Sequence, residues 1–314
     1  MLIRKAIVNI MEKCLILGAG GFIGKALCRK LHKKYEIIAY DRAYSTELES
    51  IGDIRQIVGD FSQARDFTNI LQGVDTVVHL ISTTLPSDAT DGIPEEIMNN
   101  IVPTTALLES MVKTGVRQII FSSSGGTVYG DTQDRINVVT SPLAPICSYG
   151  VQKKVIEAYL EFYGIRYGLK YKIARISNPY GVGQDTKKPQ GVIPIFIRRL
   201  LDGEPITIFG EGTEVRDYIY MDDLMALLEK LIMYEGDEHI FNIATGKVYS
   251  LQEIIDKIQK TAGKQFIEIA YEKKRFCDVR KSLLDAKTTW DLLQYSPQVS
   301  LDDGIARLCR LLEK

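Results

Sequence analysis

Two side chains able to move a proton lie four residues apart in Tyr149-Gly-Val-Gln-Lys153. On a helix this spacing places them on one face, about 6 Å apart along the axis. A free tyrosine has a pKa of about 10, but a fixed ammonium nearby favours the phenolate and lowers that value. The pair can therefore form a general base. The alternative is a surface tyrosine and lysine on an amphipathic helix, because a chain with 16 tyrosines supplies such pairs by chance.

The segments around this pair alternate between strand and helix. Short apolar runs predict strands, and helical spacing of apolar residues predicts helices at residues 97–112 and 149–163. The predicted strands are residues 13–18, 36–40, 54–58, 74–80, 118–122 and 171–176. Strands that alternate with helices form a doubly wound parallel sheet, so we predict an α/β fold of the Rossmann type.

The rhythm changes after about Asn178, where loops, a helix at 193–201 and turn signals such as Gly203-Glu-Pro205 follow. We therefore predict a first domain of residues 1–178 and a smaller mixed α/β lobe of residues 179–314. An apolar run at 239–244 predicts a strand that returns to the first domain. Residues 1–10 are interpreted either as an upstream extension or as a misplaced start.

A glycine motif, Gly18-Ala-Gly-Gly21-Phe22-Ile23-Gly24, lies between the first predicted strand and helix. Glycines at such a turn let the backbone and the helix N-terminus approach a pyrophosphate closely. Asp41 ends the second strand roughly 20 residues on, where a carboxylate accepts from the ribose hydroxyls and repels a 2′-phosphate. The motif predicts a dinucleotide site that prefers NAD, and the adjacent Arg42 keeps NADP open.

Further polar groups follow other predicted strands. Asp60-Phe61 follows the third strand, where the pair either meets the adenine or forms a turn with a core phenylalanine. His79 ends the fourth strand and is interpreted as a packed structural residue. The run Phe121-Ser-Ser-Ser-Gly-Gly-Thr-Val-Tyr129-Gly130 places hydroxyls upstream of Tyr149, although serines and glycines also suit an ordinary loop.

Together these motifs resemble the extended short-chain dehydrogenases/reductases, specifically the NAD-dependent sugar-nucleotide epimerases and dehydratases of the UDP-glucose 4-epimerase type. The likeness covers the chain from Met11. Beyond the motifs above it rests on Asn178-Pro-Tyr180-Gly181, Gly210-Glu-Gly-Thr-Glu-Val-Arg216-Asp-Tyr-Ile-Tyr220 and Arg275-Phe-Cys-Asp278-Val279.

The resemblance implies a mechanism. Tyr149 would take the proton from a sugar hydroxyl while a hydride passes to the nicotinamide, and Lys153 would hold the nicotinamide ribose and lower the tyrosine pKa. In epimerases the 4-keto sugar then turns over and takes the hydride back. Asn178, Arg216 and Arg275 would hold the nucleotide diphosphate, and surface ion pairing is the alternative for both arginines. The implied cofactor-binding residues are Gly18, Gly21, Phe22, Ile23, Gly24, Asp41, Asp60, Phe61, Leu80, Ser82, Asn100, Ser122, Tyr149 and Lys153.

Departures from the family pattern narrow the reaction. Many relatives carry Ser or Thr at the position of Gly125, so the hydroxyl that assists Tyr149 is Ser124 by first choice, with Thr127 or Ser123 as substitutes. The 4,6-dehydratases carry an Asp-Glu pair where Gly126 and Thr127 stand, and dehydration is disfavoured without it. Ser282 falls where related 4-epimerases border the sugar's 2-substituent, and its small side chain leaves room for an N-acetyl group.

We therefore predict a UDP-hexose or UDP-N-acetylhexosamine 4-epimerase, an isomerase that recycles its NAD. The first alternative is a sugar-nucleotide dehydrogenase or reductase, which would release oxidised cofactor at each turnover. A non-catalytic nucleotide-binding protein is the second.

Composition bounds the partners. The 39 basic residues nearly cancel the 40 acidic ones, which disfavours nucleic acid and acidic membranes, and no apolar run reaches the length of a membrane span. Five scattered cysteines indicate a reducing, cytoplasmic location, and three histidines without ligand-like grouping predict no metal site. The helices at 97–112 and 149–163 resemble those that pair in homodimers of this family, although a core-facing apolar stripe would look the same.

Overall fold

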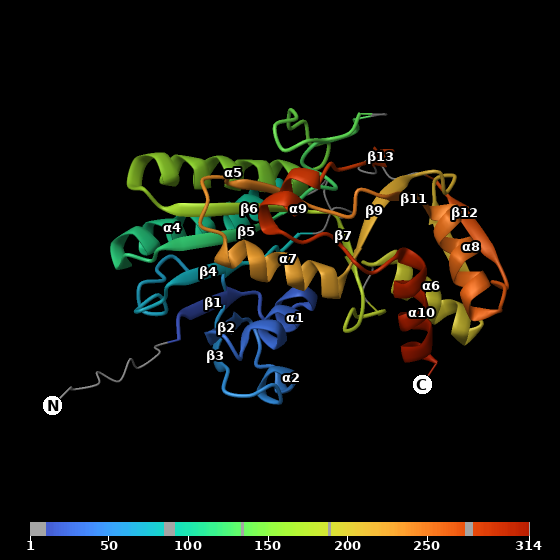
Figure 1. Ribbon diagram of the computed structural model, residues 1–314, viewed down its shortest axis with the longest axis horizontal. Coiled ribbons are helices and arrows are strands. Elements are labelled where there is room, and N and C mark those ends of the chain that lie inside the picture. The colour runs from blue at the N-terminus through green and yellow to red at the C-terminus, as the bar shows by residue number, and fades with distance from the viewer. Residues whose placement is uncertain (1–10, 85–91, 133–134, 188–189, 274–278, 314) are drawn as a thin grey trace.

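A parallel sheet with helices on both faces forms the larger part of the protein (Figure 1). The computed structural model describes residues 11–84, 92–132, 135–187, 190–273 and 279–313. Among these residues the main sheet has seven strands in the order β10-β6-β5-β4-β1-β2-β3, and each neighbouring pair is parallel. The strands are β1 (Lys13–Leu17), β2 (Glu36–Asp41), β3 (Arg55–Val58), β4 (Thr76–His79), β5 (Gln118–Ser124), β6 (Lys170–Ile176) and β10 (Ile240–Ile243).

The strands are short apolar runs because the sheet is covered on both faces. On one face α4 (Val102–Thr114) and α5 (Ser148–Tyr167) pack on the sheet through buried residues that include Leu107 and Leu160. On the other face α1 (Phe22–Leu31), α7 (Met221–Met233) and α9 (Lys287–Leu293) form a second core (Figure 1). The predicted doubly wound α/β fold is confirmed.

The strand order reverses at β1, which lies between β2 and β4. In open parallel sheets a crevice forms at such a point, beyond the carboxyl ends of the strands. The glycine loop after β1 and the segment after β4 therefore border the same crevice. The short helix α2 (Thr46–Glu49) adds Leu48 to the core on the α1 side. The short helix α3 (Ile93–Glu96) leads through a π-helical turn, η1 (Ile97–Ile101), into α4.

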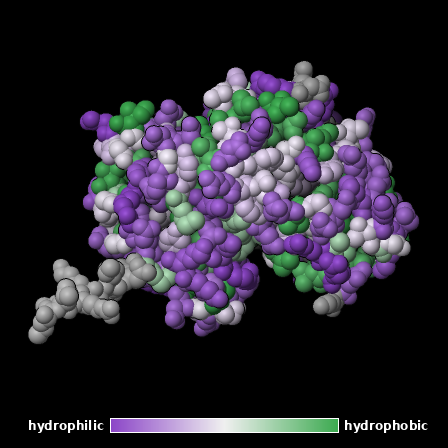
Figure 2. Space-filling view, viewed as in Figure 1, coloured by the Kyte–Doolittle hydropathy of each residue, from purple (hydrophilic) through white to green (hydrophobic). Residues whose placement is uncertain are grey.

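The second lobe is built on the remaining strands, arranged as β11-β9-β13 with β7 beside β9, and as a β12-β8 pair. These strands are β7 (Asn178–Tyr180), β8 (Ile206–Phe209), β9 (Val215–Tyr220), β11 (Val248–Ser250), β12 (Ile269–Glu272) and β13 (Lys281–Ser282). Helices α6 (Val192–Asp202), α8 (Leu251–Ala262) and α10 (Leu301–Leu312) close a separate apolar core. The outline of the molecule narrows between the two lobes (Figure 2). We propose the division at residues 1–178 and 179–314, with β10, α7 and α9 contributed to the first domain.

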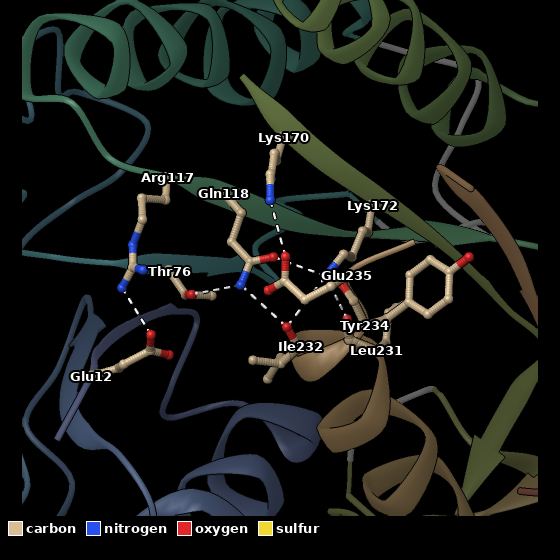
Figure 3. Close-up of polar contacts among 10 residues, drawn as sticks. All are labelled: Glu12, Thr76, Arg117, Gln118, Lys170, Lys172, Leu231, Ile232, Tyr234 and Glu235. Atoms are coloured by element: carbon tan, nitrogen blue, oxygen red, sulfur yellow. Dashed lines mark hydrogen bonds and ion pairs between the residues drawn. The ribbon is translucent and has the colours of Figure 1, made fainter. Parts of the chain in front are cut away.

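A polar cluster fastens α7 to the amino ends of the central strands (Figure 3). Lys172 of β6 is buried, and its ammonium donates to Gln118 Oε1 at 2.9 Å, to Leu231 O at 2.9 Å and to Tyr234 O. Gln118 also donates to Thr76 Oγ1 at 2.9 Å. The carbonyls at the end of α7 thus find their donors in the sheet rather than in water.

No helix in the described parts of the chain is both long and apolar enough to cross a membrane. Residues 1–10, which the sequence leaves open as an extension or a misplaced start, lie outside the described residues.

Candidate active site

In the loop between β1 and α1 the backbone at Gly18 and the backbone at Gly24 lie in close contact. A Cβ built on Gly24 would lie 2.1 Å from the Gly18 carbonyl oxygen, so no side chain fits there. Gly18 has a φ of +84°, the left-handed region that favours glycine. Gly21 caps α1, which begins at Phe22. This close turn, with a helix N-terminus behind it, fits the pyrophosphate of a dinucleotide.

Asp41 is held beside that loop at the end of β2. Its Oδ2 accepts the Gly20 N–H at 2.8 Å, and its Oδ1 accepts the Arg42 N–H at 2.7 Å. The carboxylate is thus fixed next to the glycine turn, where it fits a ribose diol and disfavours a 2′-phosphate. Both features agree with NAD as the cofactor.

The groups that follow β3 and β4 are engaged within the protein. The Phe61 ring is buried between Phe67 and His79, at centroid distances of 5.3 and 5.0 Å. Asp60 Oδ1 accepts the N–H and the hydroxyl of Ser62 at 3.0 and 2.8 Å. The Phe61 ring therefore belongs to the core, and contact of Asp60 and Phe61 with the adenine stays a prediction.

His79 is a packing residue. Its Nε2 lies 3.0 Å from Thr104 Oγ1, and burial, assisted by the Lys153 charge, lowers its pKa to about 3. The imidazole is therefore neutral at physiological pH, as its interpretation as a structural histidine requires.

The segment after β4 is anchored by Asn100 of η1. The buried Asn100 amide donates to Thr83 Oγ1 at 2.8 Å and to Gln152 Oε1 at 2.9 Å, and it accepts the Thr83 N–H at 2.9 Å. Leu80 donates its N–H to Leu17 O at 3.0 Å, and the exposed Ser82 hydroxyl donates to Thr84 O at 3.0 Å. The contacts of Asn100 position this loop against α5.

A phenol, a hydroxyl and an ammonium meet where β5 ends against the first turns of α5. Tyr149 stands beside Ser124, whose hydroxyl acts to lower the pKa of the Tyr149 phenol. The buried Lys153 ammonium donates to the Ser122 carbonyl at 2.8 Å and lies 5.5 Å from the centroid of the Tyr149 ring and 4.6 Å from that of Phe121. The structure thus brings together the side chains that the sequence proposed as a base and its cation.

Burial acts on both ionisable groups of this cluster. It raises the pKa of Tyr149 to about 12, although the hydrogen bond from Ser124 opposes the rise. It lowers the pKa of Lys153 to about 7, against the attraction of the Glu157 carboxylate. Desolvation favours the neutral phenol of Tyr149 and the neutral amine of Lys153. When Lys153 is protonated, its charge favours the Tyr149 phenolate and lowers the pKa of Tyr149.

The three candidate hydroxyls differ in their contacts. Ser124 reaches Tyr149, whereas the buried Ser123 donates to the Glu157 carboxylate. The Thr127 hydroxyl is buried and has no partner among the described residues. A Cβ at Gly125 would lie 2.4 Å from Leu284 Cδ1, which explains why Ser or Thr does not occupy that position here. The geometry favours Ser124.

The candidate substrate residues border the same place. A Cβ built on Gly126 would lie 3.9 Å from both Ser124 Oγ and Asn178 Oδ1. Arg216 of β9 is the register partner of Ser282 of β13, and the buried Ser282 hydroxyl donates to Gly125 O at 3.3 Å. Asn178 and Ser282 therefore border the turn after β5. Arg216 is the strand neighbour of Ser282, and its Nη1 donates to Val215 O at 3.0 Å. Arg275 lies outside the described residues.

Sequence reasoning missed two charged residues behind this site, Glu157 and Arg175, which form a buried ion pair at 2.7 Å. The signal for Glu157 is its spacing, because residues 149, 153 and 157 are successive one-turn steps along α5. No comparable signal marks Arg175, which stands inside an apolar strand. Among the described residues, no group of histidine, cysteine, aspartate and glutamate is arranged to hold a metal ion.

Comparison with known proteins agrees with this geometry. Residues 14–244 match the model of the NAD dependent epimerase/dehydratase family. The dTDP-4-dehydro-6-deoxyglucose reductase of Escherichia coli is 33% identical, with 94% of this chain and 96% of the relative aligned. A putative UDP-glucose 4-epimerase of Methanocaldococcus jannaschii is 32% identical over the same shares.

Among solved structures, the UDP-glucose 4-epimerase of Thermotoga maritima, determined with UDP-glucose, superposes with a TM-score of 0.88. It is 32% identical, and the match covers 95% of this chain and 97% of that one. This chain belongs to the NAD dependent epimerase/dehydratase family, and its cofactor is NAD.

Proposed function

We propose that this enzyme is a nucleotide-sugar 4-epimerase that acts on a UDP-hexose or a UDP-N-acetylhexosamine. The observation that carries the proposal is that the Lys153 ammonium, held by the Ser122 carbonyl, lies over the Tyr149 ring, with Ser124 beside the phenol. The positions that follow Ser124 in the turn carry no carboxylate. Position 126, next to the Ser124 hydroxyl, is a glycine, and position 127 is a threonine. Without an acid there, simple oxidation and return at carbon 4 is favoured over elimination of water.

In the proposed reaction Tyr149 takes the proton from the sugar's 4-hydroxyl and later returns it. Ser124 holds the same sugar oxygen by a hydrogen bond. Lys153 stabilises the phenolate of Tyr149 by its charge, and its remaining N–H groups are free to donate to a ribose. NAD, when bound by the glycine loop and Asp41, supplies the site for temporary storage of the hydride.

The second lobe would keep the nucleotide in place while the sugar turns. We propose that Asn178, Arg216 and Arg275 hold the diphosphate, because a guanidinium suits phosphate geometry. Ser282 lies between Arg216 and the turn after β5, and its small side chain leaves room for an N-acetyl group. The test is to assay UDP-galactose and UDP-N-acetylgalactosamine side by side. Turnover of the first with none of the second would remove the N-acetylated substrate from the proposal.

A sugar-nucleotide reductase is the second candidate, favoured by the similarity to the E. coli dTDP-4-dehydro-6-deoxyglucose reductase over 94% of the chain. Such an enzyme would use the same Tyr149 and Lys153. An NAD-free preparation that consumes one NADH for each keto sugar added would support the reductase and contradict the epimerase.

We also propose a homodimer and a cytoplasmic location. Large apolar side chains on the outer side of α5 are exposed, among them Phe162 at 52% and Ile165 at 81%. They form a hydrophobic patch over one end of α5 at the upper left of Figure 2. Light scattering on wild type and Ile165→Glu tests the dimer, and an unchanged monomeric mass for both would refute it.

A further inference from the structure

Behind the active site, the carboxylate of Glu157 and the guanidinium of Arg175 form a buried ion pair with several hydrogen bonds. Arg175 of β6 donates through Nε to both oxygens of Glu157 at 3.2 Å and through Nη2 to Oε2 at 2.7 Å. The Arg175 side chain is 3% exposed and that of Glu157 is 6% exposed. A buried pair of this kind is weak evidence of stability, because its desolvation offsets much of the attraction.

Glu157 is joined directly to the strand end that carries the site. Its Oε1 accepts the hydroxyl of Ser123. Ser123 stands between Ser122, whose carbonyl accepts from the Lys153 ammonium, and Ser124, which stands beside Tyr149. Arg175 is the register partner of Ser123 across β5 and β6. The ion pair and the two active-site contacts therefore share three consecutive residues of β5.

Arg175 is itself fixed from its other side. Its Nη1 donates to Tyr129 Oη at 2.9 Å and to Val139 O at 2.8 Å. The Tyr129 hydroxyl in turn donates to Asn242 Oδ1 of β10 at 2.7 Å. The guanidinium thus has no freedom to move without breaking contacts to three elements, which makes the pair a rigid reference point.

We propose that the buried Glu157–Arg175 pair is a positioning element, which fixes the carboxyl end of β5 against α5 and so sets Ser124 and the Ser122 carbonyl opposite Tyr149 and Lys153. The proposal rests on the proposed function for the roles of Tyr149 and Lys153, but it concerns residues that touch neither substrate nor cofactor.

The pair also has an electrostatic consequence for Lys153. Glu157 lies one turn beyond Lys153 on α5, and its carboxylate favours the ammonium against the effect of burial. The other ionisable groups near Lys153 are His79 of β4, which is neutral, Tyr149 of α5 and Arg175 of β6, whose charge is engaged by Glu157. Glu96 of α3 bonds Gln152 on the same helix. Removal of the Glu157 charge should therefore lower the Lys153 pKa.

The test compares wild type with Glu157→Gln/Arg175→Met, which removes both charges so that no unpaired ion stays buried. Lysine labelled with ¹³C at Cε reports the Lys153 titration in NAD-free protein, and Lys153→Met assigns the signal. Turnover and KM are measured with the NAD-loaded enzyme. Glu229→Gln is the matched control, because Glu229 is a buried carboxylate on α7 whose ion-pair partners, Lys30 and Lys34, belong to neither β5 nor α5.

We expect the Lys153 pKa of the double variant to fall by about one unit and its kcat to fall about tenfold or more, with KM little changed. Glu229→Gln should shift neither quantity. A folded double variant with wild-type kcat overturns the proposal, because β5 would then place Ser124 and the Ser122 carbonyl correctly without the pair.

If the double variant does not fold, Ser123→Ala decides, because it removes only the hydroxyl that ties β5 to Glu157. We expect its kcat to fall about threefold at unchanged NAD affinity, and a wild-type kcat would overturn the proposal. Absence of any 4-epimerase turnover in wild type would refute the proposed function alone, since the Lys153 titration would still test the pair.

Discussion

Each end of β5 accepts a hydrogen bond from a buried lysine, Lys172 of β6 at the amino end and Lys153 of α5 at the carboxyl end. The two lysines differ in the number of acceptors around their ammonium groups. Lys172, beside Gln118 at the amino end, donates to a side-chain amide and to carbonyls that end α7 (Figure 3). Lys153, at the carboxyl end, donates to a single described acceptor, the Ser122 carbonyl, and otherwise faces two aromatic rings. An ammonium has three donors, so Lys172 is saturated and Lys153 is not.

The difference separates a structural charge from a functional one. A saturated ammonium fastens elements together, whereas an ammonium with donors to spare is ready for a ligand and for a neighbouring phenol. Burial lowers both pKa values, to about 8 for Lys172 and about 7 for Lys153. The pKa alone therefore does not distinguish the two lysines. The number of hydrogen-bond acceptors around each ammonium does.

The largest expected effect is that of Lys153→Met on turnover. Loss of the ammonium removes the charge that stabilises the Tyr149 phenolate and the donor to the ribose, so kcat should fall about 1000-fold. Thermal unfolding of the NAD-free variant should change little, since few contacts are lost. Turnover within tenfold of wild type would break the comparison.

Lys172→Met should show the opposite pattern. Its removal leaves Gln118 Oε1 and the carbonyls at the end of α7 without their donor, which should cost about 2 kcal/mol of unfolding free energy. Urea unfolding measures this cost, and kcat of the folded enzyme should stay within about twofold. A large loss of turnover at unchanged stability would show that the amino end of β5 also serves the reaction.

Substitutions at the two ends of β5 itself, at Ser124 and Gln118, should show the same contrast between turnover and stability with smaller effects. Ser124→Ala removes the hydroxyl that contacts Tyr149 and should lower kcat about 30-fold with little change in stability. Gln118→Leu at the other end should lower stability and spare kcat. Steady-state kinetics and unfolding of both variants check this, and a Ser124→Ala enzyme as fast as wild type would return Thr127 to consideration.

A separate expected effect is a pH dependence of stability. The folded-state pKa of each lysine lies below its ordinary value of 10.5, so the unfolded chain binds more protons in between and stability rises with pH there. The stability of NAD-free wild type relative to Lys172→Met should therefore grow between about pH 8 and 10.5. Relative to Lys153→Met the growth should start near pH 7. If the stability difference from wild type had the same pH dependence for Lys172→Met and Lys153→Met, the different pKa values given for the two lysines would be contradicted.

Local patterns predict the carboxyl end of the sheet well. Gly18 and Gly24 are required by one tight turn, Asp41 follows a strand at a typical distance, and Tyr149 and Lys153 are one helical turn apart. Each of these signals comes from residues close together in the sequence, and the structure places them at the carboxyl ends of β1, β2 and β5 in one sheet.

Other parts of the site depend on contacts between residues far apart in the chain. Gly125 is glycine because Leu284 packs against it, and Ser282 reaches the same turn from β13. Lys172 and Arg175 stand in a strand that reads as apolar, and their partners come from other elements. The Phe61 ring, a candidate for adenine from its place in the sequence, is buried because Phe67 and His79 enclose it. No single-segment pattern contains this information.

The central claim is that the enzyme returns a hydride to the carbon from which it came. The most direct measurement is incubation of the purified enzyme, without added NADH, with UDP-galactose deuterated at carbon 4, followed by separation of the epimers and mass spectrometry. The account predicts UDP-glucose that retains the deuterium, and no product from Tyr149→Phe. Product that forms only with stoichiometric NADH and carries no label would contradict it.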